Sequence, residues 1–176
     1  MAIYKIFPEK SATLYSYYPT TNTGLDEIVE ASTYLSINET NEVSRPIIKF
    51  PSSDINDIFA NKVKSSNYDC YLKVYLANAS EIPLNFTLYA HPLSKDWNIG
   101  TGRLGNSPAT TDGVSWTYTD QSGSILWTAG TFTTGTTGSY YGTNNGGGTW
   151  WTSSAYVATQ SFTNISSKDI EMKATG

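Results

Sequence analysis

The aromatic residues between positions 97 and 151 are the side chains of this sequence best suited by type and spacing to bind a ligand or a partner. All five tryptophans fall in this region, where only Arg103, Asp112 and Asp120 carry charge. Indole and phenol rings stack on sugars and anchor protein interfaces. Adjacent residues of a strand face opposite sides, so one of two neighbouring tryptophans is expected to point outward. We therefore predict a binding or interface surface made by Trp127, Tyr140, Tyr141, Trp150 and Trp151.

Two other tryptophans, Trp97 and Trp116, are expected to pack in the core or to pin a loop. Gly and Thr, which fill the spaces between the rings, disfavour helix. The region from 97 to 151 is therefore predicted to be strand ends and long loops held on a sheet, and loops of this length are commonly functional.

The residues that could carry catalysis form a weaker pattern. His91 is the only histidine, so a multi-histidine metal site is excluded, and no Gly-x-Ser-x-Gly elbow occurs. Paired carboxylates could hydrolyse glycosides, and oxygen ligands could bind Ca²⁺, but acidic loop residues are mostly solvated charge. The acidic candidates are Asp26, Glu27, Glu30, Asp96, Asp112 and Asp120. We expect no catalytic residue, no metal and no enzymatic activity.

A glycine pattern at 100–105 matches the letters of a dinucleotide-binding motif. That motif needs a strand before it and a helix after it. Here Asn106-Ser107-Pro108 follows, with no helical period of apolar residues. We therefore expect no cofactor.

Charge and cysteine content exclude several classes of protein. The net charge is -4, and no basic residue occurs between Arg103 and Lys168, which argues against a nucleic-acid partner. Cys70 is the only cysteine, so no intramolecular disulfide can form. Residues 1–7 lack the features of a signal peptide, and no apolar run reaches membrane-spanning length. We expect a protein made in the cytoplasm that does not insert into membranes.

The elements that must position these residues are mostly short strands between Gly, Pro and Asn turns. The 176 residues suit one domain. Alternation predicts strands at 2–7, 12–18, 33–37, 45–50, 71–76, 84–90 and around Ile170 and Met172, with 71–76 and 84–90 paired as antiparallel neighbours. One helix is expected at 52–64, capped by Ser52 or Ser53, with Ile55, Ile58 and Phe59 on one face.

This order of elements predicts an all-β fold, a two-sheet antiparallel β-sandwich with jelly-roll or Greek-key connectivity. It has one short helix and long Gly/Thr/Trp-rich loops. Residues 1–176 form a single domain in this interpretation. Residues 1–10 are an N-terminal arm or edge strand, and 97–151 are the long aromatic loop region.

Several local patterns occur in an order that resembles a known family. They are the Pro-x-x-Asn-x-Gly turn at 19–24, Arg-x-Ile-Ile-x-Phe at 45–50, Leu-x-Val-x-Leu at 72–76, Leu88-Tyr89, Trp97, and Gly-Val-Ser-Trp at 113–116. The series resembles the DNRLRE (disaggregatase-related) β-sandwich family, found in secreted polysaccharide-active proteins and in structural proteins of tailed phages. The likeness covers residues 11 to 120. The stretch at 100–108 and the later tryptophans are more similar to the phage members.

The resemblance implies a structural protein of a tailed-phage virion: a tail, fibre, baseplate or capsid-decoration module that assembles as a homo-oligomer with other virion subunits and contacts a host surface glycan. Family members continue past the last strand, so the end at Gly176 implies either truncation or completion by a neighbouring subunit. The alternative is an extracellular carbohydrate-binding module of a polysaccharide-active or cell-surface protein. A third hypothesis is an accessory domain of a polysaccharide lyase or hydrolase that uses its acidic residues.

Overall fold

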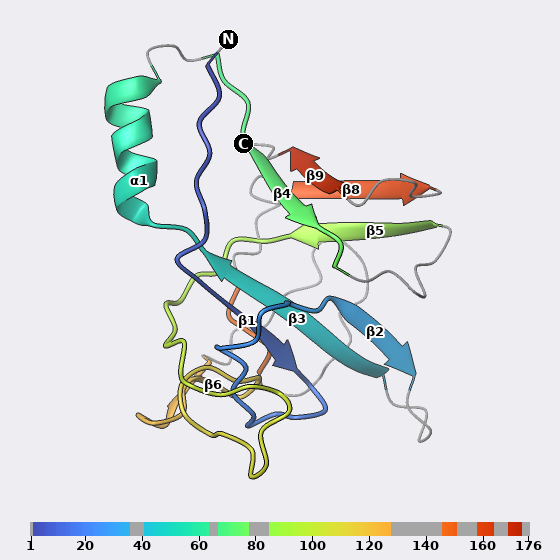
Figure 1. Ribbon diagram of the computed structural model, residues 1–176. Coiled ribbons are helices and arrows are strands. Elements are labelled where there is room, and N and C mark those ends of the chain that lie inside the picture. Colours follow the sequence, from blue (N-terminus) through green and yellow to red (C-terminus); the bar gives the residue numbers. More distant parts are fainter. Residues whose placement is uncertain are drawn as a thin grey trace.

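The residues that the structure describes form an all-β fold with one short helix, as the sequence predicts. The computed structural model describes residues 2–35, 41–63, 67–77, 85–127, 146–150, 158–163 and 169–173. Within them the strands form small antiparallel sheets (Figure 1). The elements are β1 (Lys10–Tyr15), β2 (Ser32–Leu35), β3 (Asn41–Lys49), α1 (Ser52–Asp57), η1 (Ile58–Lys62), β4 (Tyr71–Tyr75), β5 (Asn85–Ala90), β6 (Tyr118–Asp120), β7 (Ile125–Leu126), β8 (Ala158–Thr163) and β9 (Asp169–Lys173).

The largest sheet has the strand order β1-β3-β2. Ala12 and Leu14 of β1 are buried on one face together with Ile47 of β3. Because side chains alternate along a strand, Thr13 and Tyr15 lie on the opposite face. The predicted strand at 12–18 thus exists but begins earlier, at Lys10, and ends at Tyr15.

Pro46 lies within β3, the central strand of this sheet, although proline cannot donate a backbone hydrogen bond. Its partner in β1 is Thr13, whose N–H and carbonyl oxygen bond instead to the buried Thr23 hydroxyl at 2.9 and 2.7 Å. On the other side, the β2–β3 pairing ends at Ser44. Pro46 therefore occupies a position where neither neighbouring strand requires its N–H.

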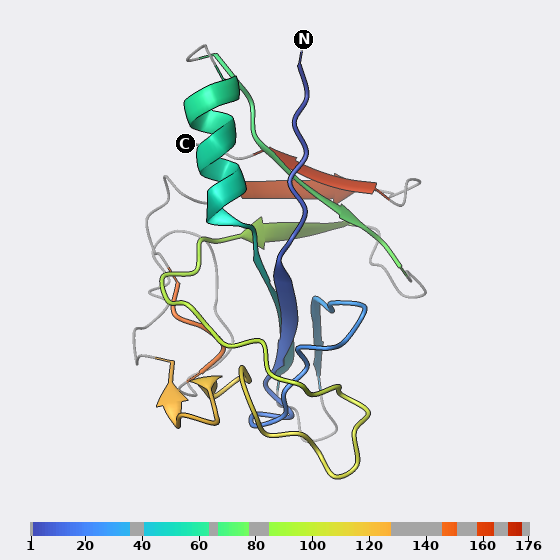
Figure 2. The same ribbon diagram turned by 60° about the vertical axis from the view of Figure 1, so that its left-hand side comes forward.

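The expected strand at 2–7 is wrong. The chain enters the sheet only at Lys10, and residues 2–8 form an arm outside any strand. Figures 1 and 2 place this arm at the same end of the molecule as α1. Ile3 and Phe7 are 73% and 76% exposed. Alternating apolar residues suit a strand, but a strand also needs a partner, and the arm has none among the described residues.

The predicted pairing of 71–76 with 84–90 is also wrong. β4 pairs with β9, and β5 pairs with β8, both antiparallel. The predicted alternation holds, since Leu72 and Val74 of β4 are more buried than their neighbours, and Ile170 and Met172 of β9 are buried. Alternation specifies which face of a strand is buried, but it does not specify the partner strand.

The predicted helix at 52–64 is confirmed as α1, extended by the wider turn η1 to Lys62. The predicted caps are wrong, because Pro51 occupies the N-cap position and no side chain caps the first turn. The helix buries none of its residues. Its Phe59 ring makes an edge contact with Tyr68 at 5.1 Å between ring centroids. No helix in the described part of the chain is both long and apolar enough to cross a bilayer.

The hydrophobic core lies between the β1–β3 sheet and the irregular segment that follows β5. The sheet contributes Ala12, Leu14 and Ile47, and the segment contributes Trp97, Val114, Trp116 and Trp127. Figure 2 shows this segment wrapping around the lower end of the sheet. The core roles predicted for Trp97 and Trp116 are confirmed, and the described loop at 97–127 contributes four buried residues to the interior.

Candidate functional site

The first half of the aromatic loop is organised around one buried amide, that of Asn22. Its Nδ2 donates to the carbonyl oxygens of Ile99 and Val114 at 2.8 and 2.7 Å. Its Oδ1 accepts from the backbone N–H groups of Gly24 and Gly102 at 3.2 and 2.7 Å. Every hydrogen-bonding atom of the carboxamide is used, as a buried amide requires. The Asn-x-Gly turn therefore holds three chain segments together.

Four glycines allow the backbone to approach Asn22 this closely. A Cβ on Gly24 would lie 1.8 Å from the carbonyl oxygen of Ile99. A Cβ on Gly102 would lie 2.5 Å from the carbonyl oxygen of Asn22. Gly100 and Gly113 have φ values of +72° and +63°, which favour glycine. The glycine pattern at 100–105 is thus explained by packing around an asparagine.

A second junction joins residues 146–150 to the core. The Arg45 guanidinium lies 4.8 Å from the centroid of the Trp116 ring and donates to the carbonyl oxygen of Gly147 at 2.8 Å. Trp150 donates its indole N–H to the same oxygen at 2.9 Å. A guanidinium stacked on an indole is a favourable cation–π arrangement. Trp150 is half-buried in this junction.

The predicted binding surface of Trp127, Tyr140, Tyr141, Trp150 and Trp151 is only partly covered by the structure. Trp127 is 4% exposed and donates its indole N–H to the Ser115 carbonyl oxygen at 2.9 Å. Trp127 therefore belongs to the core, because an indole with a buried acceptor and apolar neighbours is stabilised inside. Tyr140, Tyr141 and Trp151 lie outside the described residues. A shared binding role for the group stays a prediction.

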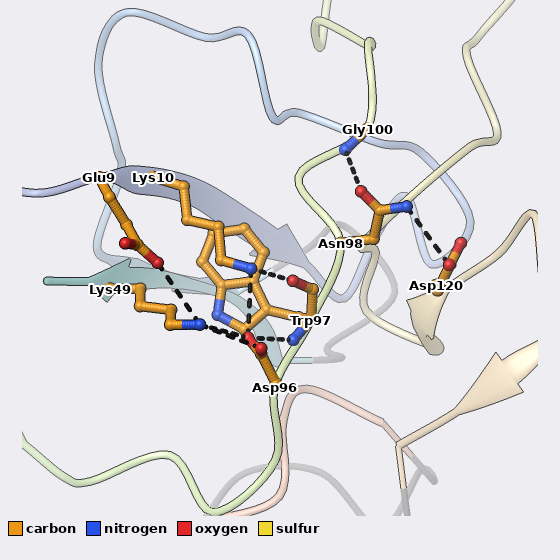
Figure 3. Close-up of polar contacts among 8 residues, drawn as sticks. All are labelled: Glu9, Lys10, Lys49, Asp96, Trp97, Asn98, Gly100 and Asp120. Carbon is orange, nitrogen blue, oxygen red and sulfur yellow. Dashed lines mark hydrogen bonds and ion pairs between the residues drawn. The ribbon is translucent and has the colours of Figure 1, made fainter. Parts of the chain in front are cut away.

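The acidic candidate Asp96 belongs to a charged cluster at the edge of the sheet (Figure 3). It pairs with Lys49 at 3.0 Å and Lys10 at 3.2 Å and accepts the Trp97 N–H at 2.8 Å. Lys10 also donates to the Trp97 carbonyl oxygen and lies over its ring. Partial burial of Asp96 is outweighed by these hydrogen bonds, which bring its pKa down to about 2. The cluster fixes Trp97 against β1.

Asp112, Asp26 and Glu27 hold loops. Asp112 accepts from the N–H and hydroxyl of Thr101 at 2.9 and 2.7 Å, and the backbone bond is the first cause of its lowered pKa. Asp26 accepts from the Leu104 N–H, and Glu27 pairs with Arg103 at 3.6 Å. Within the described residues, no group of three or more potential ligands could hold a metal ion.

The candidate histidine lies next to β5. The His91 ring stacks on Tyr89, with 6.2 Å between centroids and 20° between planes. Burial, and after it the positive charge of Arg45, lower the pKa of His91. The imidazole is therefore neutral at pH 7 and acts as an aromatic neighbour.

A pocket of about 190 Å³ lies at the end of the β1-β3-β2 sheet. Tyr15, Ser44 and Ser32 form one row across the three strands, since Tyr15 pairs with Ser44 and Ser44 with Ser32. Paired residues point to the same face of a sheet, so their hydroxyl groups gather on the face away from Leu14. The full lining is Tyr15, Tyr17, Tyr18, Glu30, Ser32, Glu42, Val43, Ser44 and Leu104.

Hydroxyl groups from this row converge on one carboxylate, that of Glu30. Tyr15 donates to Oε2 at 3.1 Å, and Ser32 and Ser44 donate to Oε1 at 2.6 and 3.5 Å. Burial first, and then the charge of Glu30, raise the pKa of Tyr15 well above its usual value. The phenol therefore stays protonated as a donor, and three hydroxyl groups fix the carboxylate at the pocket.

The pocket's rings come from a short Tyr-x-Tyr-Tyr sequence at the end of β1. Tyr17 and Tyr18 are 56% and 46% exposed. Their rings meet at 79° with centroids 4.8 Å apart, and Tyr15 meets Tyr18 at 73° and 6.4 Å. The sequence did not predict this site, because its tryptophans are the more conspicuous aromatic residues. Three tyrosines in four positions before a Pro-x-x-Asn-x-Gly turn were the available signal.

Comparison of the chain with protein-family models, curated proteins and solved structures finds no match in any of the three. The resemblance to the DNRLRE family therefore stays a prediction that rests on the residues quoted for it.

Proposed function

We propose that this chain is a non-enzymatic structural protein of a tailed-phage virion, a tail, fibre, baseplate or capsid-decoration module that acts by oligomeric assembly. We further propose that its small sheets belong to a two-sheet sandwich of jelly-roll or Greek-key type. The contact between β8 and β9, which joins the β5–β8 and β4–β9 pairs, supports this arrangement. The protein would be made in the host cytoplasm and act within the particle.

The observation that carries the assembly proposal is the apolar arm at residues 2–8. Ile3, Tyr4 and Phe7 are all exposed, at the same end of the molecule as α1. An apolar side chain that becomes buried contributes about 1.5–3 kcal/mol, and exposed apolar groups of this kind are typical of subunit contacts. The arm is thus the segment best suited to contact a second subunit.

The test is the oligomeric state measured by sedimentation over a wide range of concentrations. The parent chain is expected to self-associate, and an Ile3→Ser/Phe7→Ser variant to dissociate, with unchanged thermal unfolding because both side chains are exposed. Ile28→Ser is a matched control, since Ile28 is also exposed but lies outside the arm. A parent chain that stays monomeric at every concentration would contradict the proposal.

The second candidate function is carbohydrate binding, which would place the protein outside the cell or at a host surface. The tyrosine pocket favours it, because exposed aromatic rings and preorganised hydroxyl and carboxylate groups are the usual contacts for sugars. Both oxygens of Glu30 accept hydrogen bonds from hydroxyl groups, which suits a carboxylate that holds a ligand. Calorimetric titration with a panel of monosaccharides tests this function, and Tyr17→Ala is expected to abolish any binding at the pocket.

A further inference from the structure

The charge of the tyrosine pocket restricts what it can bind. Glu30 and Glu42 line it, and no Lys or Arg is among its lining residues. Arg103, next to the lining residue Leu104, is paired with Glu27. Glu30 forms no ion pair within the part of the chain that the structure describes. An anionic ligand would meet the like charge of Glu30 here, whereas a cation would meet a carboxylate already held in place.

The arrangement of the rings points to the same class of ligand. The rings do not lie side by side in one plane, because Tyr17 and Tyr18 stand nearly perpendicular, and so do Tyr15 and Tyr18. Perpendicular rings form the walls of a corner. Aromatic corners that combine tyrosine faces with negative charge bind ammonium groups by cation–π attraction.

The size of the pocket limits the ligand. Drug-sized ligands occupy pockets of about 300–1,000 Å³, so a pocket of about 190 Å³ takes one head group or one sugar ring. The Ser32 and Ser44 hydroxyl groups already contact each other at 2.8 Å. The polar floor is therefore set before a ligand arrives.

We propose that this pocket binds an organic ammonium group, presented to Glu30 and the tyrosine rings as the protonated amine of an amino sugar. The identity of the carrier rests on the carbohydrate-binding function proposed above, whereas the preference for an ammonium group rests on the pocket's rings and charge.

Calorimetry with the full chain at neutral pH tests the proposal, using glucosamine, glucose, glucuronate and choline as probes. Glucosamine is expected to bind about five- to thirty-fold more tightly than glucose. This range corresponds to about 1–2 kcal/mol of cation–π attraction. Glucuronate is expected not to bind. Choline, an ammonium without a sugar ring, is expected to bind and to compete with glucosamine.

Three variants locate the site. Tyr17→Ala removes an exposed ring and is expected to abolish binding at the pocket. Glu30→Gln removes the charge while keeping a hydrogen-bond acceptor and is expected to abolish the preference for glucosamine. Tyr75→Ala removes a tyrosine of β4 that is also exposed but lies outside the pocket, and it is expected to change nothing. Thermal unfolding of each variant checks that the fold is intact.

The possible failures separate the two proposals. Equal binding of glucosamine and glucose, lost in Tyr17→Ala, would overturn the ammonium preference and leave carbohydrate binding standing. Choline binding without any sugar binding would support the ammonium site and overturn the carbohydrate function. Failure of all four probes to bind would overturn both.

Discussion

The side chain of Asn22 donates to the carbonyl oxygen of Val114 at 2.7 Å, across 92 residues of sequence and inside the protein. This hydrogen bond joins the turn after β1 to the loop that delivers Trp116 to the core. Because the carboxamide also binds Ile99, Gly24 and Gly102, one residue fixes the path of the aromatic loop over the sheet. The stability of the loop should therefore depend on this amide.

Replacing Asn22 with alanine should destabilise the protein by about 3 kcal/mol or more, since each buried polar group left unpaired costs about 1–3 kcal/mol. Urea unfolding measures the loss. Asn106→Ala is the matched control, because Asn106 is exposed and its side chain, among the described residues, bonds to the Thr110 hydroxyl alone, so its effect should stay within about 0.5 kcal/mol. Equal effects of the two substitutions would show that Asn22 does not organise the loop.

Substitution by alanine should be strongly destabilising at one glycine of this loop and nearly neutral at another. A Cβ on Gly113 would lie 2.5 Å from the backbone of Gly100, and its φ of +63° is unfavourable for alanine, whereas a Cβ on Gly105 would meet open space. Gly113→Ala is expected to lower the melting temperature strongly or to prevent folding. Gly105→Ala should leave it nearly unchanged, and a large loss there would contradict the packing described.

Replacing Trp127 and Trp150 with phenylalanine should cost different amounts of stability, because the carbonyl oxygens that accept from their indole N–H groups differ in their other donors. In Trp127→Phe the buried Ser115 carbonyl oxygen loses the indole N–H, and ring volume is lost from the core, which should cost about 2–4 kcal/mol. In Trp150→Phe the Gly147 carbonyl oxygen still accepts from Arg45, so the loss should be smaller. Chemical denaturation compares them, and the reverse order would place Trp127 outside the core.

Asp96 should make stability depend on pH in the acid range. Its pKa of about 2 in the folded protein lies below the ordinary value of 3.8, so its contribution is full above about pH 4 and is lost as the pH falls through 2. The contribution is expected to be below about 1 kcal/mol, because the carboxylate is 68% exposed. The difference in unfolding free energy between the protein and Asp96→Asn should vanish near pH 2 and shrink in high salt. A difference that is independent of pH would rule out this ionic role.

Local sequence patterns predicted much of the fold. The alternation correctly indicated a half-buried face at Leu72 and Val74 and a buried face at Ile170 and Met172. The period of Ile55, Ile58 and Phe59 indicated the helix. The strand predicted at 2–7 was wrong, since the alternation of apolar residues in the arm is as regular as that of a true strand. The predicted strand pairing was also wrong, because β4 pairs with β9 and β5 with β8 rather than with one another.

The candidate site was less accessible to prediction. The sequence predicted a binding or interface role for Trp127 and Trp150, but it could not show that Trp127 is buried and Trp150 half-buried. The pocket needed three strands in register before Tyr15, Ser44 and Ser32 could meet at Glu30. No spacing within the sequence encodes that meeting.

By itself, the sequence determined the all-β class, the single short helix and the turn at Asn22, because these depend on side-chain alternation and on the backbone freedom of nearby residues. Only the tertiary structure decided which strands pair, which tryptophans are buried and where hydroxyl groups gather around a carboxylate. Those features depend on contacts between residues far apart in the chain, such as Asn22 with Val114, which form only when the whole sheet and its covering loop are assembled.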